Sequence, residues 1–148
     1  MLRLSKLTDY AIVVMTDMAG EPDGVFSAAE LAARTHLEQP TVAKVLKALT
    51  KSGLIRSYRG ANGGYQLGPQ PRNISVAQVI AAMEGPIGMT ECSVHEGLCA
   101  QEAVCTTRSN WRRISQAVEM ALHDVTLQDM TQPMVPPIDI RRMRVVRG

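Results

Sequence analysis

The residues of this 148-residue chain best suited to chemistry are its three cysteines. Cys92, Cys99 and Cys105 are separated by six and five residues. Structural zinc sites usually pair their cysteines about two to four residues apart, so this spacing fits zinc poorly. Wider spacing in a loop suits thiolates that wrap around a larger group, such as an iron–sulfur cluster. We therefore predict a cluster in this loop, of the 2Fe–2S or the 4Fe–4S type.

Three thiolates leave one ligand position of such a cluster open. The candidates are His95 in the same loop, a carboxylate from elsewhere, or a small thiol. A cluster with a weak fourth ligand is labile, and lability suits a sensor better than an electron carrier.

Other interpretations of the cysteines stay open. Free cysteine is often a core residue, although here the neighbours are polar, among them Glu91, Ser93 and Glu102. The thiols could also bind zinc or form disulfides that switch the protein.

The chain lacks a signal segment and any apolar run long enough to cross a bilayer, so we expect a cytoplasmic, reducing location and no membrane partner. An odd number of cysteines in that location disfavours a disulfide framework.

An enzyme is not expected. His95 is the only base near the cysteines, so no nucleophile and base are arranged as a pair. The sequence has neither a phosphate-binding loop nor a motif of paired carboxylates.

The elements ahead of the cysteines predict a mainly α fold with a small β-hairpin. Ser27 and Glu30 form a capping box that starts a helix ending near Thr35. Pro40 opens another helix at a position where its missing N–H costs nothing. The predicted helices cover 8–19, 27–35, 40–52 and 76–83, and a hairpin with a glycine-rich tip covers 54–67.

Two short helices, a tight link and a glycine-tipped hairpin are typical of a winged helix-turn-helix, which places its second helix in the major groove of double-stranded DNA. The helix 40–52 is then the recognition helix. The candidate DNA-binding residues are Gln39, Thr41, Lys44, Lys47, Lys51, Arg56, Arg59 and Asn62. The alternative is that the lysines form a solvated helix face. The formal net charge of +2 is weak evidence for a nucleic-acid partner. Because only 3% of the residues are aromatic, a surface that stacks the unpaired bases of a single strand is disfavoured.

A long amphipathic helix is predicted after the cysteines, from about Thr106 to Thr131. Its apolar stripe consists of Trp111, Ile114, Val118, Leu122 and Val125. A monomer would leave part of this stripe exposed, which favours pairing of two chains over packing within one. The predicted organisation is a DNA-binding domain (1–84), a cluster loop (85–105), a dimerisation helix (106–132) and a disordered basic tail (133–148).

Two segments and the cysteines together resemble a known family. The opening MLRLSKLTDY, the hairpin segment RGANGGYQLG (59–68) and three spaced cysteines before a helix with Trp111 resemble the iron–sulfur-cluster regulators and nitric-oxide-sensing repressors that include IscR and NsrR. The resemblance spans residues 1–132, and the opening is most similar to the branch that regulates the SUF iron–sulfur assembly operon.

The resemblance implies a homodimer on a pseudo-palindromic operator, with Cys92, Cys99 and Cys105 as cluster ligands. The IscR branch uses a histidine three residues after the last cysteine, where this chain has Arg108. The nitric-oxide-sensing branch uses an aspartate in the first helix of the partner subunit, which Asp9 matches here. Asp9 is therefore expected as the fourth ligand, with His95 in reserve, although Asp9 also suits a helix start.

The function implied is a repressor that controls iron–sulfur assembly genes according to the state of its cluster. The alternatives are a nitric-oxide- or redox-sensing repressor of the same fold, and a winged-helix regulator switched by zinc or by thiol oxidation.

Overall fold

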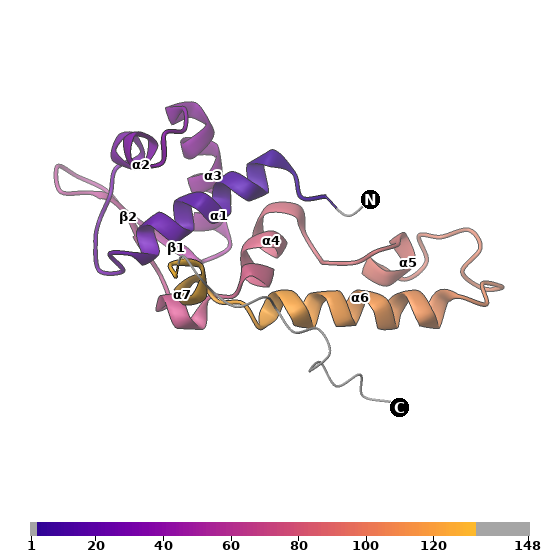
Figure 1. Ribbon diagram of the computed structural model, residues 1–148. Coiled ribbons are helices and arrows are strands. Elements are labelled where there is room, and N and C mark those ends of the chain that lie inside the picture. Colours follow the sequence, from indigo (N-terminus) through magenta and orange to yellow (C-terminus); the bar gives the residue numbers. More distant parts are fainter. Residues whose placement is uncertain (1–2, 133–148) are drawn as a thin grey trace.

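The computed structural model of the protein describes residues 3–132 and has two visibly different parts (Figure 1). We call residues 3–84 and 124–132 the body, and residues 85–123 the arm. The basic tail predicted to be disordered, 133–148, lies outside the described residues. Within the described range, no helix is both long and apolar enough to cross a membrane.

The body contains most of the elements. Helices α1 (Lys6–Ala19), α2 (Ala28–Thr35), α3 (Gln39–Lys51) and α4 (Val76–Glu84) surround an apolar core. A hairpin of β1 (Ile55–Tyr58) and β2 (Gly64–Leu67), a short 3-10 turn η1 (Pro71–Asn73) and α7 (Leu127–Met130) complete it. The arm consists of α5 (Glu91–Val94) and α6 (Arg108–His123), joined by the stretch with Cys99 and Cys105.

Local sequence signals place the body helices. The Ser27 side chain accepts a hydrogen bond from the Glu30 N–H, and the Glu30 side chain accepts one from the Ser27 N–H, as the predicted capping box requires. Ser75 and Gln78 form the same reciprocal pair at the start of α4. These caps satisfy donors that helix starts leave free, so each helix begins where the sequence indicates.

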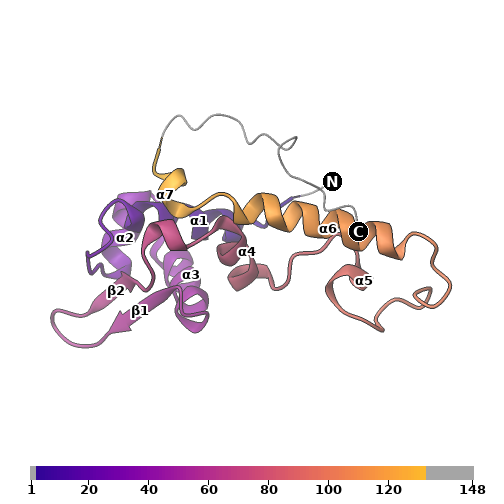
Figure 2. The ribbon, with the colours of Figure 1, turned by 90° about the horizontal axis from the view of Figure 1, so that it is seen from below.

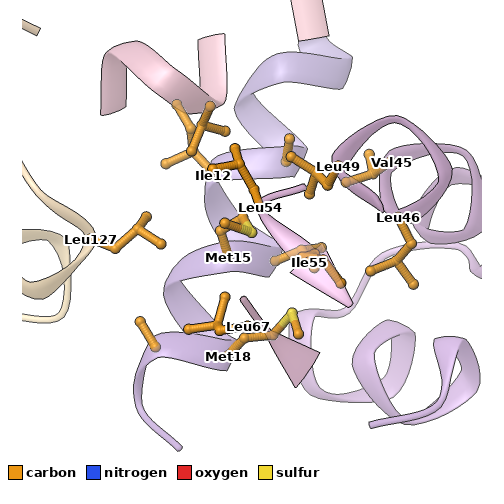
Figure 3. Packing of buried hydrophobic residues seen from close by; sticks show 14 of the residues in the cluster. Ile12, Met15, Met18, Val45, Leu46, Leu49, Leu54, Ile55, Leu67 and Leu127 are labelled. Carbon is orange, nitrogen blue, oxygen red and sulfur yellow. The ribbon is translucent and has the colours of Figure 1, made fainter. Parts of the chain in front are cut away.

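One hydrophobic cluster holds the body together (Figure 3). Met15 and Met18 of α1, Leu46 and Leu49 of α3 and Leu127 of α7 are all completely buried in it. The hairpin adds Ile55 and Leu67, which are paired across the antiparallel ladder. The body is therefore mainly helical with one small two-stranded sheet, as predicted.

The segment before α2 extends the hairpin. Phe26 exchanges two backbone hydrogen bonds with Tyr65 of β2, at 2.9 and 2.7 Å. Gly64 lies against the Phe26 backbone, which leaves no room for a Cβ atom there. The end of β2 nearest the hairpin tip is thus fastened to the segment between α1 and α2.

The helix predicted over 106–131 is interrupted. The structure has α6 up to His123 and a separate helix, α7. Thr126 and Asp129 form a capping box that starts a new helix, and the Leu127 N–H donates to the Ile74 carbonyl oxygen. Breaking the helix turns Leu127 into the core, where it is fully buried.

The arm projects away from the hairpin. In both views α6 extends to the side of the body, and α5 with the cysteine stretch lies along its first half, at the far end of the molecule (Figures 1 and 2). The cysteines are therefore well separated from the hairpin and α3. A signal at the cysteines would have to reach DNA-contacting elements through α6 and the body.

Candidate nucleic-acid interface and cysteine loop

The turn between α2 and α3 has the tight geometry of a helix-turn-helix. His36, the residue after α2, adopts a left-handed backbone with φ of 57°. The Leu37 N–H then donates to the Ala32 carbonyl oxygen, which closes the turn. Two residues later α3 begins at Gln39.

One face of α3 is anchored in the body and the opposite face is open. The anchors Val42, Val45, Leu46 and Leu49 are completely buried. Spacing along a helix then directs Lys44, Lys47 and Lys51 outward, and all three are exposed. Among the residues described, none of these lysines forms an ion pair with a carboxylate. Their charge is therefore available to an external polyanion. Gln39 at the start of α3 is exposed and Thr41 is half-buried.

The hairpin begins where α3 ends and adds further basic and polar groups (Figure 2). Arg56, Arg59 and Asn62 are all exposed. The tip needs glycine, because a Cβ atom on Gly63 would collide with the Tyr58 carbonyl oxygen and Gly60 has a φ of 106°.

Two hydrogen bonds brace the strands of the hairpin. The Tyr58 hydroxyl donates to Gln66 Oε1 at 3.1 Å, and Gln66 Nε2 donates to the Asp23 carbonyl oxygen at 3.0 Å. The second bond ties the hairpin to the segment before α2. The eight predicted DNA-binding residues therefore lie on two adjoining elements, seven of them exposed and Thr41 half-buried. Sequence reasoning missed the bracing residues, since no local signal links Gln66 with Asp23.

The three cysteines differ in their surroundings. Cys92 is buried in α5, with its Sγ 3.2 Å from Thr90 Oγ1. Cys99 and Cys105 are half-buried. Hydrogen bonds from the Thr107 hydroxyl and then from the Thr107 N–H hold the pKa of the Cys105 thiol below its ordinary value. This shift favours the thiolate form, which is the form of cysteine that binds metals and reacts with oxidants.

The arrangement of donors does not form a metal site in one chain. Within residues 3–132, no three His, Cys, Asp or Glu side chains come close enough together to hold a metal ion. His95 and Asp9, the two predicted fourth ligands, are exposed at the end of α5 and in the first turn of α1. The donor types suit an iron–sulfur cluster, but in this conformation the residues do not fit one.

Instead, charged groups close the loop on α6. Arg108 forms an ion pair with Glu102, and Arg112 contacts Glu96 at 2.8 Å. The Arg112 Nε also donates to the Cys92 carbonyl oxygen at 3.3 Å. Arg112 is the main cause of the lowered pKa of the Glu96 carboxyl. We did not predict these pairs, although arginines four residues apart on a helix, after a loop with glutamates, are a visible signal.

The other side of α6 presents apolar residues to solvent. Trp111 is 39% exposed and Ile114 44%. Ser115 is the only residue of α6 that is buried, and its Oγ accepts a hydrogen bond from the Met89 N–H at 2.9 Å. Leu122 and Val125, also in the predicted stripe, pack against the body core. One half of the predicted apolar stripe therefore packs against the body, and the other half is exposed.

A helix-turn-helix with an exposed basic face, whose lysines have no carboxylate partner within 3–132, and an adjoining braced hairpin are typical of a winged-helix DNA-binding protein. Comparison with known proteins narrows this class. The model of the Rrf2 family, described as iron-dependent transcriptional regulators, matches residues 4–133, and the chain belongs to this family.

Relatives and solved structures agree with this assignment. The transcriptional regulator IscR of Yersinia enterocolitica is 32% identical over 130 residues, which cover 87% of this chain and 79% of that protein. The structure of CymR, the global cysteine regulator of B. subtilis, superposes with a TM-score of 0.69 at 32% identity and covers 88% of this chain and 97% of CymR. T. potens IscR gives 0.64 at 32% identity, with 87% and 85% covered. The protein is thus a transcriptional regulator and not an enzyme, as expected from the sequence.

Proposed function

We propose that this protein is a homodimeric repressor that binds a pseudo-palindromic operator and controls iron–sulfur assembly genes through an iron–sulfur cluster on its cysteine loop. Residues 1–84 bind DNA, residues 85–105 form the sensor loop and residues 106–132 supply the dimer contact. The observation that most supports the DNA-binding part is the row of exposed lysines on α3 beside the hairpin, none of which pairs with a carboxylate in the described part of the chain.

The proposed DNA contacts follow from where each group lies. The N-terminus of α3, with Gln39 and Thr41, enters the major groove and contacts base edges. Lys44, Lys47 and Lys51 contact phosphates on either side, which adds affinity that falls with salt. The hairpin residues Arg56, Arg59 and Asn62 reach the neighbouring minor groove, whose negative potential attracts arginine.

The proposed dimer rests on the uncovered apolar half of α6. Leu122 near the end of α6 packs against the body, but a monomer leaves Trp111 and Ile114 of the same apolar stripe exposed. Trp111 and Ile114 lie one turn apart on its open side, where the same residues of a second chain can pack against them across a two-fold axis. The dimer would present two recognition helices to two half-sites.

The proposed cofactor rests on donor chemistry and on the likeness to IscR. Cys92, Cys99 and Cys105 would supply three thiolates, and Asp9 of the partner subunit would supply the fourth ligand. A cluster would contribute a bond network that is lost under iron starvation, oxidants or nitric oxide. Because the thiols are not gathered in the structure described, cluster binding requires the loop to rearrange.

Two properties of the loop favour an alternative signal. The thiols are apart, and the Cys105 pKa is lowered by Thr107, which suits a thiol that reacts with an oxidant. The alternative function is a repressor of the same fold that is switched by thiol oxidation or by zinc.

One experiment separates these signals. The protein is purified without oxygen as wild type, Cys99→Ala and Asp9→Ala, and its absorption, iron, sulfide and zinc content are measured. Broad absorption near about 400 nm with iron and sulfide, lost in Cys99→Ala and weakened in Asp9→Ala, is expected for the cluster. A colourless, iron-free protein that cannot be reconstituted would refute the cluster and leave zinc or thiol oxidation as the signal.

The DNA part is tested with the same preparations. Duplexes selected by the protein from a random pool should share a two-fold symmetric sequence, with half-sites about one helical turn apart. If wild-type protein selects no common sequence and its weak binding does not depend on α3 lysines, the operator hypothesis is wrong.

A further inference from the structure

The strongest polar contact between the cysteine loop and α6 is the pair of Arg108 with Glu102. The Glu102 side chain is only 12% exposed and that of Arg108 30%, so water screens this pair weakly. The second carboxylate oxygen of Glu102 accepts a hydrogen bond from the Gly97 N–H at 2.6 Å. Glu102 therefore fastens two parts of the loop to the start of α6 at once.

A second arginine one turn along α6 acts on the other end of the loop. Arg112 donates to Glu96 at 2.8 Å and to the Cys92 carbonyl oxygen at 3.3 Å. Arg108 also reaches Glu96, at 3.5 Å. The two arginines and two glutamates therefore form a connected network, and such networks hold a loop better than isolated surface pairs do.

In this closed arrangement the loop does not bring the three thiols together as a metal site among the described residues. The closed state also has a weakness. The Nε of Arg108 is buried and has no hydrogen-bond partner among the residues described, and an unsatisfied buried donor costs free energy. The closed loop therefore combines ion pairs that stabilise it with one buried donor that destabilises it.

We propose that Arg108, Arg112, Glu96 and Glu102 form a charge clasp that keeps the cysteine loop closed on α6 with its three thiols apart, and that the clasp must open before the three thiols can bind a metal together. This inference rests on the proposed role of the loop as a sensor. It makes the loop an element with two arrangements, which is what a switch needs. Arg108 and Glu102 are positioning residues in this scheme and do not act as ligands.

The first test measures the closed state with no metal present. Hydrogen exchange of the amides in 96–105 is followed by mass spectrometry in the full chain, kept reduced and with a chelator, for wild type, Arg108→Gln, Glu102→Gln and the double variant. Each single change should speed exchange in this segment by roughly three- to tenfold. The increase in the double variant should be smaller than the product of the two single increases, because both changes break the Arg108–Glu102 pair.

Glu91→Gln is the matched control, since it removes one carboxylate from the same loop outside the clasp. Its exchange over 96–105 should equal that of wild type. Unchanged exchange of the α3 amides shows that each variant keeps its folded body. If Glu102→Gln exchanges at the rate of Glu91→Gln, the clasp does not hold the loop and the inference is wrong.

The second test measures competition between the clasp and ligation, with Co²⁺ alone as the probe. Thiolate-to-cobalt absorption reports binding by the cysteines. We expect Glu102→Gln and Arg108→Gln to bind Co²⁺ more tightly than wild type, since less free energy is needed to open the loop. Equal or weaker binding, or no cobalt band at all, would overturn the competition. An iron-free protein with a working clasp would refute the proposed cluster only, so the two failures are distinguishable.

Discussion

Different kinds of contact stabilise the body and the arm. In the body, more than twenty buried residues form one core, with α1, α3, α4, the hairpin and α7 all contributing. In the arm, only Cys92 and Ser115 are buried, and the contacts that fix the loop are ion pairs and single hydrogen bonds. We therefore expect the body to be rigid and the arm to change its conformation more easily.

The difference also explains how a signal can be transmitted. Side-chain packing resists small shifts, whereas a polar closure on a helix surface has alternatives of similar free energy. A change in the loop would alter α6, and α6 contacts the body core through Leu122 near its C-terminus. The recognition helices of a dimer would then move as rigid units.

The largest expected effect is the loss of unfolding free energy when a cavity is made in the core of the body. Leu46→Ala removes a completely buried side chain of α3 and should lower the free energy of unfolding by about 2–5 kcal/mol. Urea unfolding followed by circular dichroism measures it. Val104→Ala in the arm, at a side chain that is 74% exposed, is the counterpart, and its effect on the unfolding of the body should stay within about 0.5 kcal/mol. Equal losses at both sites would mean that the arm shares the core of the body.

A slightly smaller effect is expected on DNA binding when the open face of α6 is charged. Ile114→Glu places a carboxylate in the proposed dimer contact and should give a monomer by analytical ultracentrifugation. Affinity for a two-fold symmetric duplex should fall by roughly a hundredfold, because two half-sites are no longer bound together. Met120→Glu, at an exposed position of α6 outside the apolar stripe, should remain dimeric. A dimeric Ile114→Glu protein would place the dimer contact elsewhere.

A third test compares the contribution to DNA binding of a positive charge in the body with that of a positive charge in the arm. Lys44→Ala on α3 should weaken operator binding by roughly three- to tenfold and reduce the slope of log K against log salt by about 1. Arg113→Ala removes an exposed cation from α6 in the arm and should change neither quantity. Fluorescence anisotropy over a series of salt concentrations measures both. If the two variants behave alike, net charge matters more than the face of α3.

The body was largely predictable from the sequence because its signals are local. The capping residues Ser27 and Ser75, and the buried spacing of Val42, Val45 and Leu49, each lie within one element. The prediction failed at 124–131, where Thr126 and Asp129 cap α7 in the same way as Ser27 and Glu30 cap α2. The apolar stripe that runs through Leu122 and Val125 concealed this signal.

The arm was less predictable because its contacts join residues distant in sequence. Helix α5 has only four residues and no side-chain cap, so no pattern announces it. The pair of Arg108 with Glu102 depends on how the loop folds back onto α6. The exposed groups of α3 and the hairpin were identified from position alone, whereas the cysteines were identified as a set that the structure leaves apart.

The smallest effect concerns the end of α4, next to the point where the arm begins. Glu84 is the last residue of α4, immediately before the arm, and its Oε1 accepts hydrogen bonds from the Thr8 hydroxyl at 2.6 Å and from the Ser5 N–H at 2.8 Å. These bonds, that of Thr8 first, hold the pKa of the Glu84 carboxyl below its ordinary value. They fasten the start of α1 to the edge of the body.

A lowered pKa in the folded state means that ionised Glu84 adds stability above the pKa of the unfolded chain, and that this stability is lost as pH falls through the folded pKa. Glu84→Gln keeps an acceptor oxygen but not the charge. Because Glu84 is exposed, the loss in unfolding free energy at pH 7 should be only about 0.5 kcal/mol. Urea unfolding between pH 7 and pH 3 should show the gap to wild type closing as the pH falls, while Glu119→Gln on α6 should match wild type throughout. A gap that stays constant with pH would mean that the charge of Glu84 does not stabilise the body, and that the loss comes from weaker hydrogen bonds of the amide to Thr8 and Ser5.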